Sequence, residues 1–197
     1  MSGRPFHHGN LRAALLDQAE AVLRERGIDA LSLRELAREA GVSHGAPRSH
    51  FIDRSALLDA LAERGFIRLA DELREAAPRV PKGYAGALHA AGSAYLRFAV
   101  REPALLDLMF AAKADGPSEA VRSAAERLFD TMTDIMSAGV EAGAYGARDV
   151  GRLTLLLAAT VQGISALVAS RRISTPQGEA LLYDAITLFL AGSPAER

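Results

Sequence analysis

The residues best suited to a chemical task lie close together between positions 43 and 50. Arg48 carries a guanidinium group that can pair with a phosphate or with a guanine edge, and Gly45 and Ala46 leave room for close approach. If this segment is helical, its outer face consists of His44, Gly45, Ala46, Pro47, Arg48 and Ser49. A surface of small and basic residues favours contact with the base edges and phosphates of a nucleic acid.

The remaining residues offer little catalytic chemistry. The chain has no cysteine, which excludes disulfides and thiolate metal sites. It also has no H-E-x-x-H zinc motif, no glycine-rich phosphate loop and no nucleophile at the end of a strand. His7 and His8 are adjacent, but two neighbouring histidines on an N-terminal arm are more often solvated than bound to a metal. We therefore predict that the chain is not an enzyme and uses no cofactor.

Three short helices are predicted to position the segment. A first helix spans about 10–26, and the Ser32-Leu-Arg-Glu35 capping box predicts a second helix from 33 to about 40. Gly41 can take the positive φ of a tight turn, and Ser43 can cap a third helix from 44 to 51. Two helices joined by such a turn follow the helix-turn-helix plan, in which the second helix enters the DNA major groove.

The rest of the chain repeats its apolar residues with a period near 3.6, and no alternating strand pattern appears. Further helices are predicted at about 54–77, 84–101, 104–112, 117–141, 149–171 and 177–191. The expected fold class is all-α, with about nine helices. We expect a DNA-binding domain over 1–55, extending to about 68 through the start of the fourth helix. Residues 56–197 would form a C-terminal domain for effector binding and dimerisation.

Charge and hydropathy are consistent with a cytoplasmic protein that binds DNA. The net charge is −1, but residues 1–54 hold eight arginines and seven acidic residues, and a DNA-binding patch does not require a basic protein. The N-terminus lacks the apolar run of a secretory signal. Residues 153–170 contain no charged side chain and approach the length of a membrane span. Because this stretch includes Thr154, Thr160 and Gln162, we expect a helix buried in protein on most sides and no membrane contact.

The C-terminal helices have more apolar surface than one chain can bury. The last two, at 149–171 and 177–191, would pair with a twofold copy of themselves as a four-helix bundle. Methionine, aromatic and polar side chains on the preceding helices favour a small-molecule cavity, and the alternative is a filled core. The candidate lining residues are Tyr95, Phe98, Met109, Phe110, Leu128, Met132, Met136 and Gln162.

The N-terminal motifs resemble those of the tetracycline-repressor (TetR) family. The resemblance covers about residues 6–66, through Leu36-Ala37, Ala40-Gly41-Val42-Ser43, Gly45, His50-Phe51 and Leu57-Leu58. Arg48 stands where the family usually has a tyrosine that contacts phosphate, and Arg54 stands where it usually has a lysine. The C-terminal half is similar to the Trp-His-Gly branch of the family, although an alanine and Gln162 replace the tryptophan and the histidine.

The resemblance implies a homodimer that binds double-stranded operator DNA and a small-molecule effector, most commonly as a repressor. It assigns contacts with the DNA backbone to Ser32, Arg34, Arg48 and Arg54. The residues expected to face the bases are Gly45, Ala46, Pro47 and Ser49, and Arg4 would reach an adjacent minor groove as an arm. The expected DNA-contact residues are Arg4, Ser32, Arg34, Ser43, His44, Gly45, Ala46, Pro47, Arg48, Ser49, His50 and Arg54. The alternative is a helical small-molecule-binding or adaptor protein with a degenerate DNA reader, since Pro47 and Arg48 could distort the reading surface.

Overall fold

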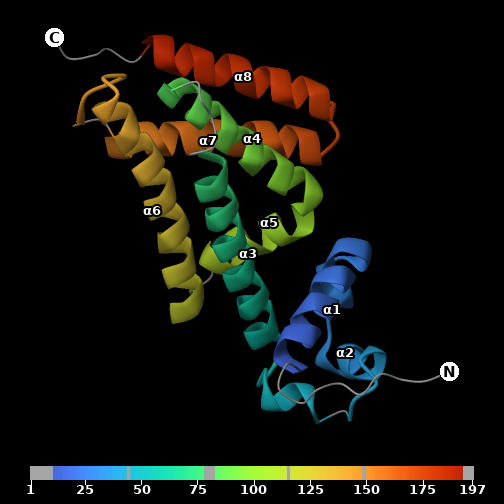
Figure 1. The fold of residues 1–197 in the computed structure, drawn as a ribbon. Helices are drawn as coiled ribbons and strands as arrows, with labels where there is room; N and C mark the ends of the chain where they lie inside the picture. The colour runs from blue at the N-terminus through green and yellow to red at the C-terminus, as the bar shows by residue number, and fades with distance from the viewer. Residues whose placement is uncertain (1–10, 44, 78–82, 115, 148–149, 193–197) are drawn as a thin grey trace. The chain divides into compact units, whose positions relative to one another are not determined.

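The structure is a computed structural model that describes residues 11–43, 45–77, 83–114, 116–147 and 150–192. Within these ranges the chain contains eight α-helices, two short 3₁₀-helices and no strand (Figure 1). It divides into two compact units, Met1–Gly65 with Ala104–Ser123 and Phe66–Pro103 with Ala124–Arg197. The predicted all-α fold class is confirmed.

The α-helices begin and end close to the positions predicted from caps and breaks. Their bounds are α1 (Leu11–Arg26), α2 (Leu33–Glu39), α3 (Arg54–Ala76), α4 (Gly83–Arg101), α5 (Pro103–Ala114), α6 (Glu119–Glu141), α7 (Val150–Ala169) and α8 (Thr175–Gly192). The two 3₁₀-helices span Ile28–Ala30 and Pro47–Ser49. The expected α-helix over 44–51 is therefore wrong for the described residues, where the chain forms only a single tight turn.

The first unit is held together by apolar side chains from α1, α2, the first half of α3 and α5. Those no more than 2% exposed include Leu15, Leu23, Leu31, Leu36, Phe51, Leu57, Leu61 and Met109. Asp53 caps α3, because its carboxylate accepts a hydrogen bond of 2.8 Å from the backbone N–H of Ala56. The start of α3 is thereby fixed directly after Phe51, which anchors the preceding turn in the core.

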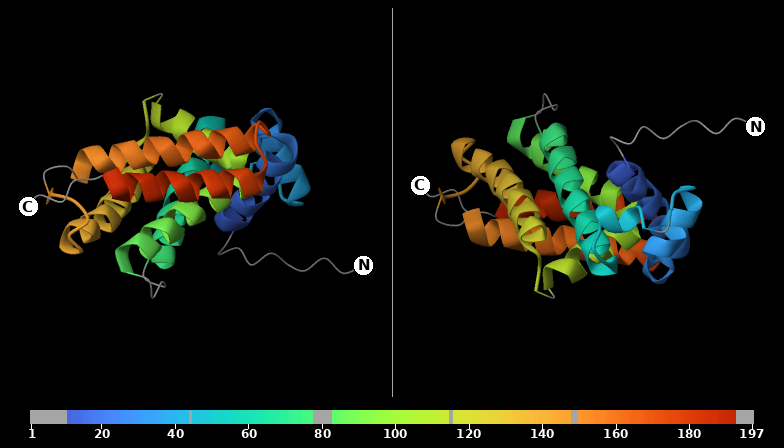
Figure 2. Two further views of the ribbon diagram at one scale, coloured as in Figure 1. Left: turned by 90° about the horizontal axis from the view of Figure 1, so that it is seen from above. Right: turned by 90° about the horizontal axis from the view of Figure 1, so that it is seen from below.

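The second unit is built around α4, α7 and α8, each of which packs against the other two. The views in Figures 1 and 2 show α7 and α8 side by side and antiparallel, joined by a short connection. The second half of α3 and most of α6 belong to the same unit. Leu88, Phe98, Ile164, Leu182 and Ile186 are buried where these helices meet.

Helix α7 differs from the prediction that it is buried on most sides. It is the one helix of the described residues long and apolar enough to cross a membrane, and 28% of its apolar window is buried within one chain. Leu153, Ile164 and Val168 face the core, whereas Leu155 and Leu156 on the other side are 61% and 55% exposed. The prediction is wrong for a single chain because one face of α7 has no partner among the described residues.

Candidate nucleic-acid interface and ligand cavity

The turn after α2 forms as the sequence predicts. Gly41 has a φ of +66°, in the left-handed region that favours glycine. The N–H of Val42 donates to the carbonyl of Ala37 (3.0 Å), and the N–H of Gly41 donates to that of Arg38 (3.3 Å). These two bonds form a Schellman motif, which satisfies the last carbonyls of α2. The motif fixes the direction in which the chain leaves α2 towards Gly45.

Hydrogen bonds from residue i+3 to residue i organise the following segment. The N–H of Ala46 donates to the carbonyl of Ser43, and the N–H of Arg48 donates to that of Gly45. Pro47 stands at the start of the 3₁₀-helix, where its missing N–H costs no helical hydrogen bond, and its carbonyl accepts from the N–H groups of both His50 (3.0 Å) and Phe51 (2.8 Å). The N-cap position of the 3₁₀-helix falls on Ala46 and not on Ser43 as predicted, and the carbonyl of Ser43 accepts from the N–H of Ala46. Pro47 is buried, so the expectation that it faces the bases is also wrong.

The exposed residues of this turn form a small basic surface. Gly45, Arg48, Ser49 and His50 are exposed, and Ala46 is half-buried. The Ser49 hydroxyl donates to the carbonyl of Ala46 (2.7 Å), which leaves its oxygen as an acceptor towards solvent. The predicted contact residues Arg4 and His44 lie outside the described residues. The turn thus presents a guanidinium, a hydroxyl and an imidazole on a surface otherwise made of small residues.

The start of α2 provides a second exposed surface. The hydroxyl of Ser32 accepts a hydrogen bond of 3.1 Å from the N–H of Glu35, as expected of the N-cap, and Arg34 next to it is exposed. The Glu35 carboxylate does not complete a capping box but binds Arg38 and lies 3.8 Å from Arg26. The hydrogen bond from Arg38 holds the pKa of Glu35 below its usual range.

Arg54, a predicted phosphate contact, hydrogen-bonds to the backbone of its own unit. Its Nε donates to the carbonyl of Leu31 (2.9 Å), and its Nη2 donates to the carbonyl of Ile28 (2.6 Å). The guanidinium therefore ties the start of α3 to the 3₁₀-helix between α1 and α2. Two of the five N–H donors of the guanidinium are directed at backbone carbonyls, and its phosphate contact stays a prediction.

Replacement of Arg54 by alanine is expected to lower the free energy of unfolding by about 1–2 kcal/mol, since two charge-assisted hydrogen bonds on a partly exposed side chain are lost. Arg54→Lys should recover part of this loss, because an ammonium group can reach only one carbonyl well. Urea unfolding measures the change, with Arg34→Ala as the matched control that leaves stability unaltered. Loss of DNA affinity without loss of stability would instead identify Arg54 as a phosphate contact.

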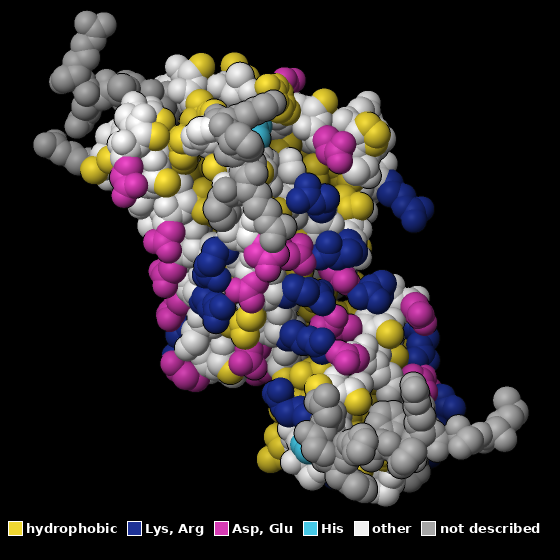
Figure 3. Space-filling view, viewed as in Figure 1, with side chains coloured by type: hydrophobic (Ala, Val, Ile, Leu, Met, Phe, Trp, Pro, Cys, Tyr) yellow, Lys and Arg dark blue, Asp and Glu magenta, His cyan; other side chains and the backbone are white. Residues whose placement is uncertain are grey.

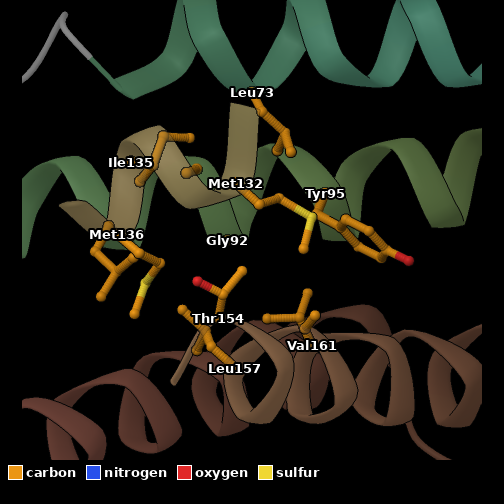
Figure 4. Close-up of a pocket in the computed structure, with 12 residues that line it drawn as sticks. Leu73, Gly92, Tyr95, Met132, Ile135, Met136, Thr154, Leu157 and Val161 are labelled. Carbon is orange, nitrogen blue, oxygen red and sulfur yellow. The ribbon is translucent and has the colours of Figure 1, made fainter. Parts of the chain in front are cut away.

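A cavity lies within the second unit, between α4, α6, α7 and the end of α3 (Figure 4). Its volume is about 60 Å³, and its lining contains no charged side chain. The lining residues are Leu73 from α3, Leu88, Ala91, Gly92 and Tyr95 from α4, Met132, Ile135 and Met136 from α6, and Thr154, Leu157, Ala158 and Val161 from α7. The site is suited to a small, uncharged and mainly apolar molecule.

Three of the expected lining residues, Tyr95, Met132 and Met136, contribute to this cavity. The other five do not line it. Phe98 is fully buried, with Arg68 5.4 Å and Arg101 5.6 Å from its ring centre. Leu128 is buried elsewhere in the core, and Gln162 lies on the exposed face of α7. Met109 and Phe110 belong to α5, in the first unit.

Two tyrosines at the edge of the cavity have no counterpart in the predictions. Tyr84 near the start of α4 and Tyr145 in the connection between α6 and α7 hydrogen-bond to each other and to Met136. Tyr145 also makes an edge-to-face contact with Phe189, with ring centres 6.1 Å apart. Tyr84 continues the apolar stripe of Leu88, Ala91 and Tyr95 in α4, whereas Tyr145, 61 positions later, lies between α6 and α7, so no local pattern in the sequence associates the two.

Ion pairs connect the part of α3 that reaches the cavity to its neighbours. Asp71 accepts hydrogen bonds of 2.9 Å from Arg74 and from Arg127 on α6, and Arg74 also binds the hydroxyl of Thr131 (2.7 Å). Glu72 lies 2.6 Å from Arg101 on α4. Figure 3 shows basic and acidic side chains interleaved on the face of the molecule that is viewed in Figure 1. Each exposed pair is weak alone, but together they join α3 to both walls of the cavity.

Comparison with known proteins matches both parts of the chain. Residues 15–61 match the family model described as bacterial regulatory proteins, tetR family. Residues 88–189, more than half of the chain, match the model described as tetracyclin repressor-like, C-terminal domain. No match was found among curated proteins.

Solved structures show the same fold along the whole chain. A protein of unknown function from Rhodococcus sp. RHA1 is 40% identical, with a TM-score of 0.89, over 98% of this chain and 100% of that one. The TetR family transcriptional regulator PfmR from Thermus thermophilus is 20% identical, with a TM-score of 0.68, over 93% and 99% of the two chains. A regulatory protein of the tetR family from Rhodococcus RHA1 is 18% identical, with a TM-score of 0.67, over 94% and 98%.

The helix-turn-helix geometry and the two family matches agree, and the predicted family and absence of enzyme activity are both supported by them. The chain belongs to the tetracycline-repressor family, whose members are DNA-binding transcriptional regulators and not enzymes.

Proposed function

We propose that this chain is a homodimeric, cytoplasmic repressor that releases a palindromic operator when a small, mainly apolar molecule enters the cavity of the second unit. The observation that carries the proposal is the course of α3. This helix begins at Arg54, a few residues after the turn at Pro47–Ser49, and its Leu73 lines the cavity. One continuous helix therefore runs from the DNA-reading turn to the cavity lining.

The proposed release is a shift between two populations. A ligand larger than the cavity must move its walls, and α3 is joined to both by Glu72–Arg101 and Asp71–Arg127. Movement of α3 in each protomer would change the separation of the two reading turns. A few kcal/mol of differential ligand affinity between the two states suffices to shift such an equilibrium strongly.

Dimerisation through α7 and α8 supplies the second reading turn in this proposal. The outer face of α7 presents Leu155, Leu156 and Ala159, and α8 presents Leu181 and Leu188, which are 44% and 71% exposed. Burial of these faces in an intermolecular four-helix bundle removes apolar surface from water. Twofold symmetry then matches two half-sites about 34 Å apart. We also propose that the C-terminal half belongs to the Trp-His-Gly branch of the family.

The test is to select from a pool of random DNA duplexes with the purified chain at several salt concentrations and to sequence the bound fraction. A palindromic consensus with sub-micromolar, salt-dependent affinity is expected. Arg48→Ala should weaken binding about tenfold and lower the salt slope by about one, as expected for the loss of one ionic phosphate contact. Weak binding with no consensus would instead support the ligand-binding adaptor with a degenerate reader.

A further inference from the structure

The cavity lining offers a ligand little polar contact. The hydroxyl of Thr154 donates to the carbonyl of Val150 (2.7 Å), so its proton is already used within α7. Figure 4 shows the ring of Tyr95 beside Met132, with its hydroxyl directed away from the other labelled side chains. Thr154 Oγ1 can therefore only accept a hydrogen bond from a ligand, and any further polar partner must come from outside the lining.

Such a partner lies directly behind Met136. The hydroxyl of Tyr145 donates to the backbone carbonyl of Met136 (2.7 Å), and both Tyr84 Oη and Tyr145 Oη lie 3.6 Å from Met136 Sδ. The tyrosines pack closely on α6, because a Cβ atom added at Gly139 would collide with both rings. Met136 thus lines the cavity and also contacts both tyrosine hydroxyls.

Met136 is also a side chain that a ligand can displace. Pockets for small molecules usually hold about 300–1,000 Å³, whereas this cavity holds about 60 Å³. A ligand must therefore move part of the lining. Methionine is unbranched and has three rotatable side-chain bonds, so Met132 and Met136 are the easiest lining residues to rearrange. Rotation of Met136 would open the cavity towards Tyr84 and Tyr145.

The directions of the hydrogen bonds made by the Tyr84 and Tyr145 hydroxyls determine which ligand group can bind to them. The single hydroxyl proton of Tyr145 is committed to the Met136 carbonyl, so Tyr84 is the donor in the bond between the two tyrosines. The oxygen of Tyr84 then keeps a lone pair for an incoming donor. Burial raises the pKa of both tyrosines, which keeps them neutral at physiological pH. A neutral donor is therefore favoured over an anionic group.

We propose that Tyr84 and Tyr145 form the polar end of the effector site, and that the effector is an uncharged, mainly apolar molecule with a hydroxyl group that donates to Tyr84. The proposal rests on the proposed function, because it takes the cavity to be the effector site. It adds the chemical class of the effector and two binding residues that do not line the empty cavity.

The experiment measures binding of three matched probes to the full-length protein by calorimetry, without DNA. The probes are propylbenzene, 4-propylphenol and 4-propylbenzoate. The phenol is expected to bind about five- to tenfold more tightly than propylbenzene, the range expected for one net hydrogen bond. The benzoate should bind more weakly than either, because the site offers no charge partner to a carboxylate.

Variants separate a binding role from a structural role. In Tyr84→Phe the ratio of phenol to propylbenzene affinity should fall to about one, while propylbenzene affinity itself is retained. Tyr95→Phe is the control, because it removes a hydroxyl from a cavity-lining tyrosine and should leave the ratio unchanged. The ratio is taken within one variant, so a general loss of stability does not alter it.

Three results would overturn this inference without affecting the proposed function. The first is equal affinity of the wild-type protein for 4-propylphenol and propylbenzene. The second is a preference for the phenol that persists in Tyr84→Phe, and the third is a preference that disappears in Tyr95→Phe. If none of the probes binds, the cavity is not a ligand site and the proposed effector release fails together with the inference. Operator binding measured on the same protein shows independently whether the DNA-binding part of the proposed function holds.

Discussion

A Leu155→Glu/Leu156→Glu double variant is expected to be monomeric and to bind its operator about 100-fold more weakly or worse, because one half-site alone remains available to each molecule. Both leucines are more than half exposed on the outer face of α7. Two carboxylates there would face their symmetry copies across a twofold interface and would have to be buried without partners. Analytical ultracentrifugation measures the mass, and fluorescence anisotropy with operator duplex measures the affinity.

The matched control adds the same charge elsewhere in the same unit. Ala138 on α6 and Ala142 directly after it are exposed, so Ala138→Glu/Ala142→Glu should remain dimeric with unaltered operator affinity. A double α7 variant that stays dimeric would place the interface on another surface. A monomer that keeps full affinity would show instead that DNA recognition needs only one reading turn.

The sequence predicts the helices well because their ends depend on local chemistry. Ser32 and Asp53 cap the helices that follow them, and Gly41 takes the positive φ that its turn requires. These features involve residues only a few positions apart. The segment around Pro47 is harder, because a short run with helical composition gives little basis for distinguishing an α-helix from consecutive 3₁₀ turns. In the structure the carbonyls of Ser43, Gly45 and Ala46 accept from N–H groups three residues later, and a bond from four residues later joins Phe51 to Pro47.

The candidate sites are less predictable because periodicity identifies an apolar stripe without showing what covers it. Leu156 and Leu157 are neighbours in one apolar run, yet Leu156 is exposed and Leu157 lines the cavity. Arg54 occupies the position of a phosphate contact by family resemblance, but Ile28 and Leu31, more than 20 residues earlier, receive its hydrogen bonds. Both outcomes depend on the angles between helices, which one sequence does not specify.

Phe51→Ala is expected to lower the stability of the first unit by about 3–5 kcal/mol, the usual range for removing a buried phenylalanine ring. Phe51 is 2% exposed, and Arg12 lies over its ring at 5.4 Å. It links the Pro47–Ser49 turn to the start of α3, so its loss releases the reading turn from the core. Operator binding should disappear, while the dimer formed by the second unit persists. Hydrogen exchange should show lost protection in α1 and α2, with α7 and α8 unchanged.

The neighbouring residue makes the sharpest control for this effect. Ile52 is 81% exposed although it is a large apolar residue, so Ile52→Ala should alter stability by no more than about 0.5 kcal/mol. Phe51 and Ile52 are adjacent and both apolar, and only their burial separates them. A large loss of stability in both variants would place Ile52 in the core as well. A loss of operator affinity in Ile52→Ala without a loss of stability would make its exposed side chain part of the DNA-contact surface.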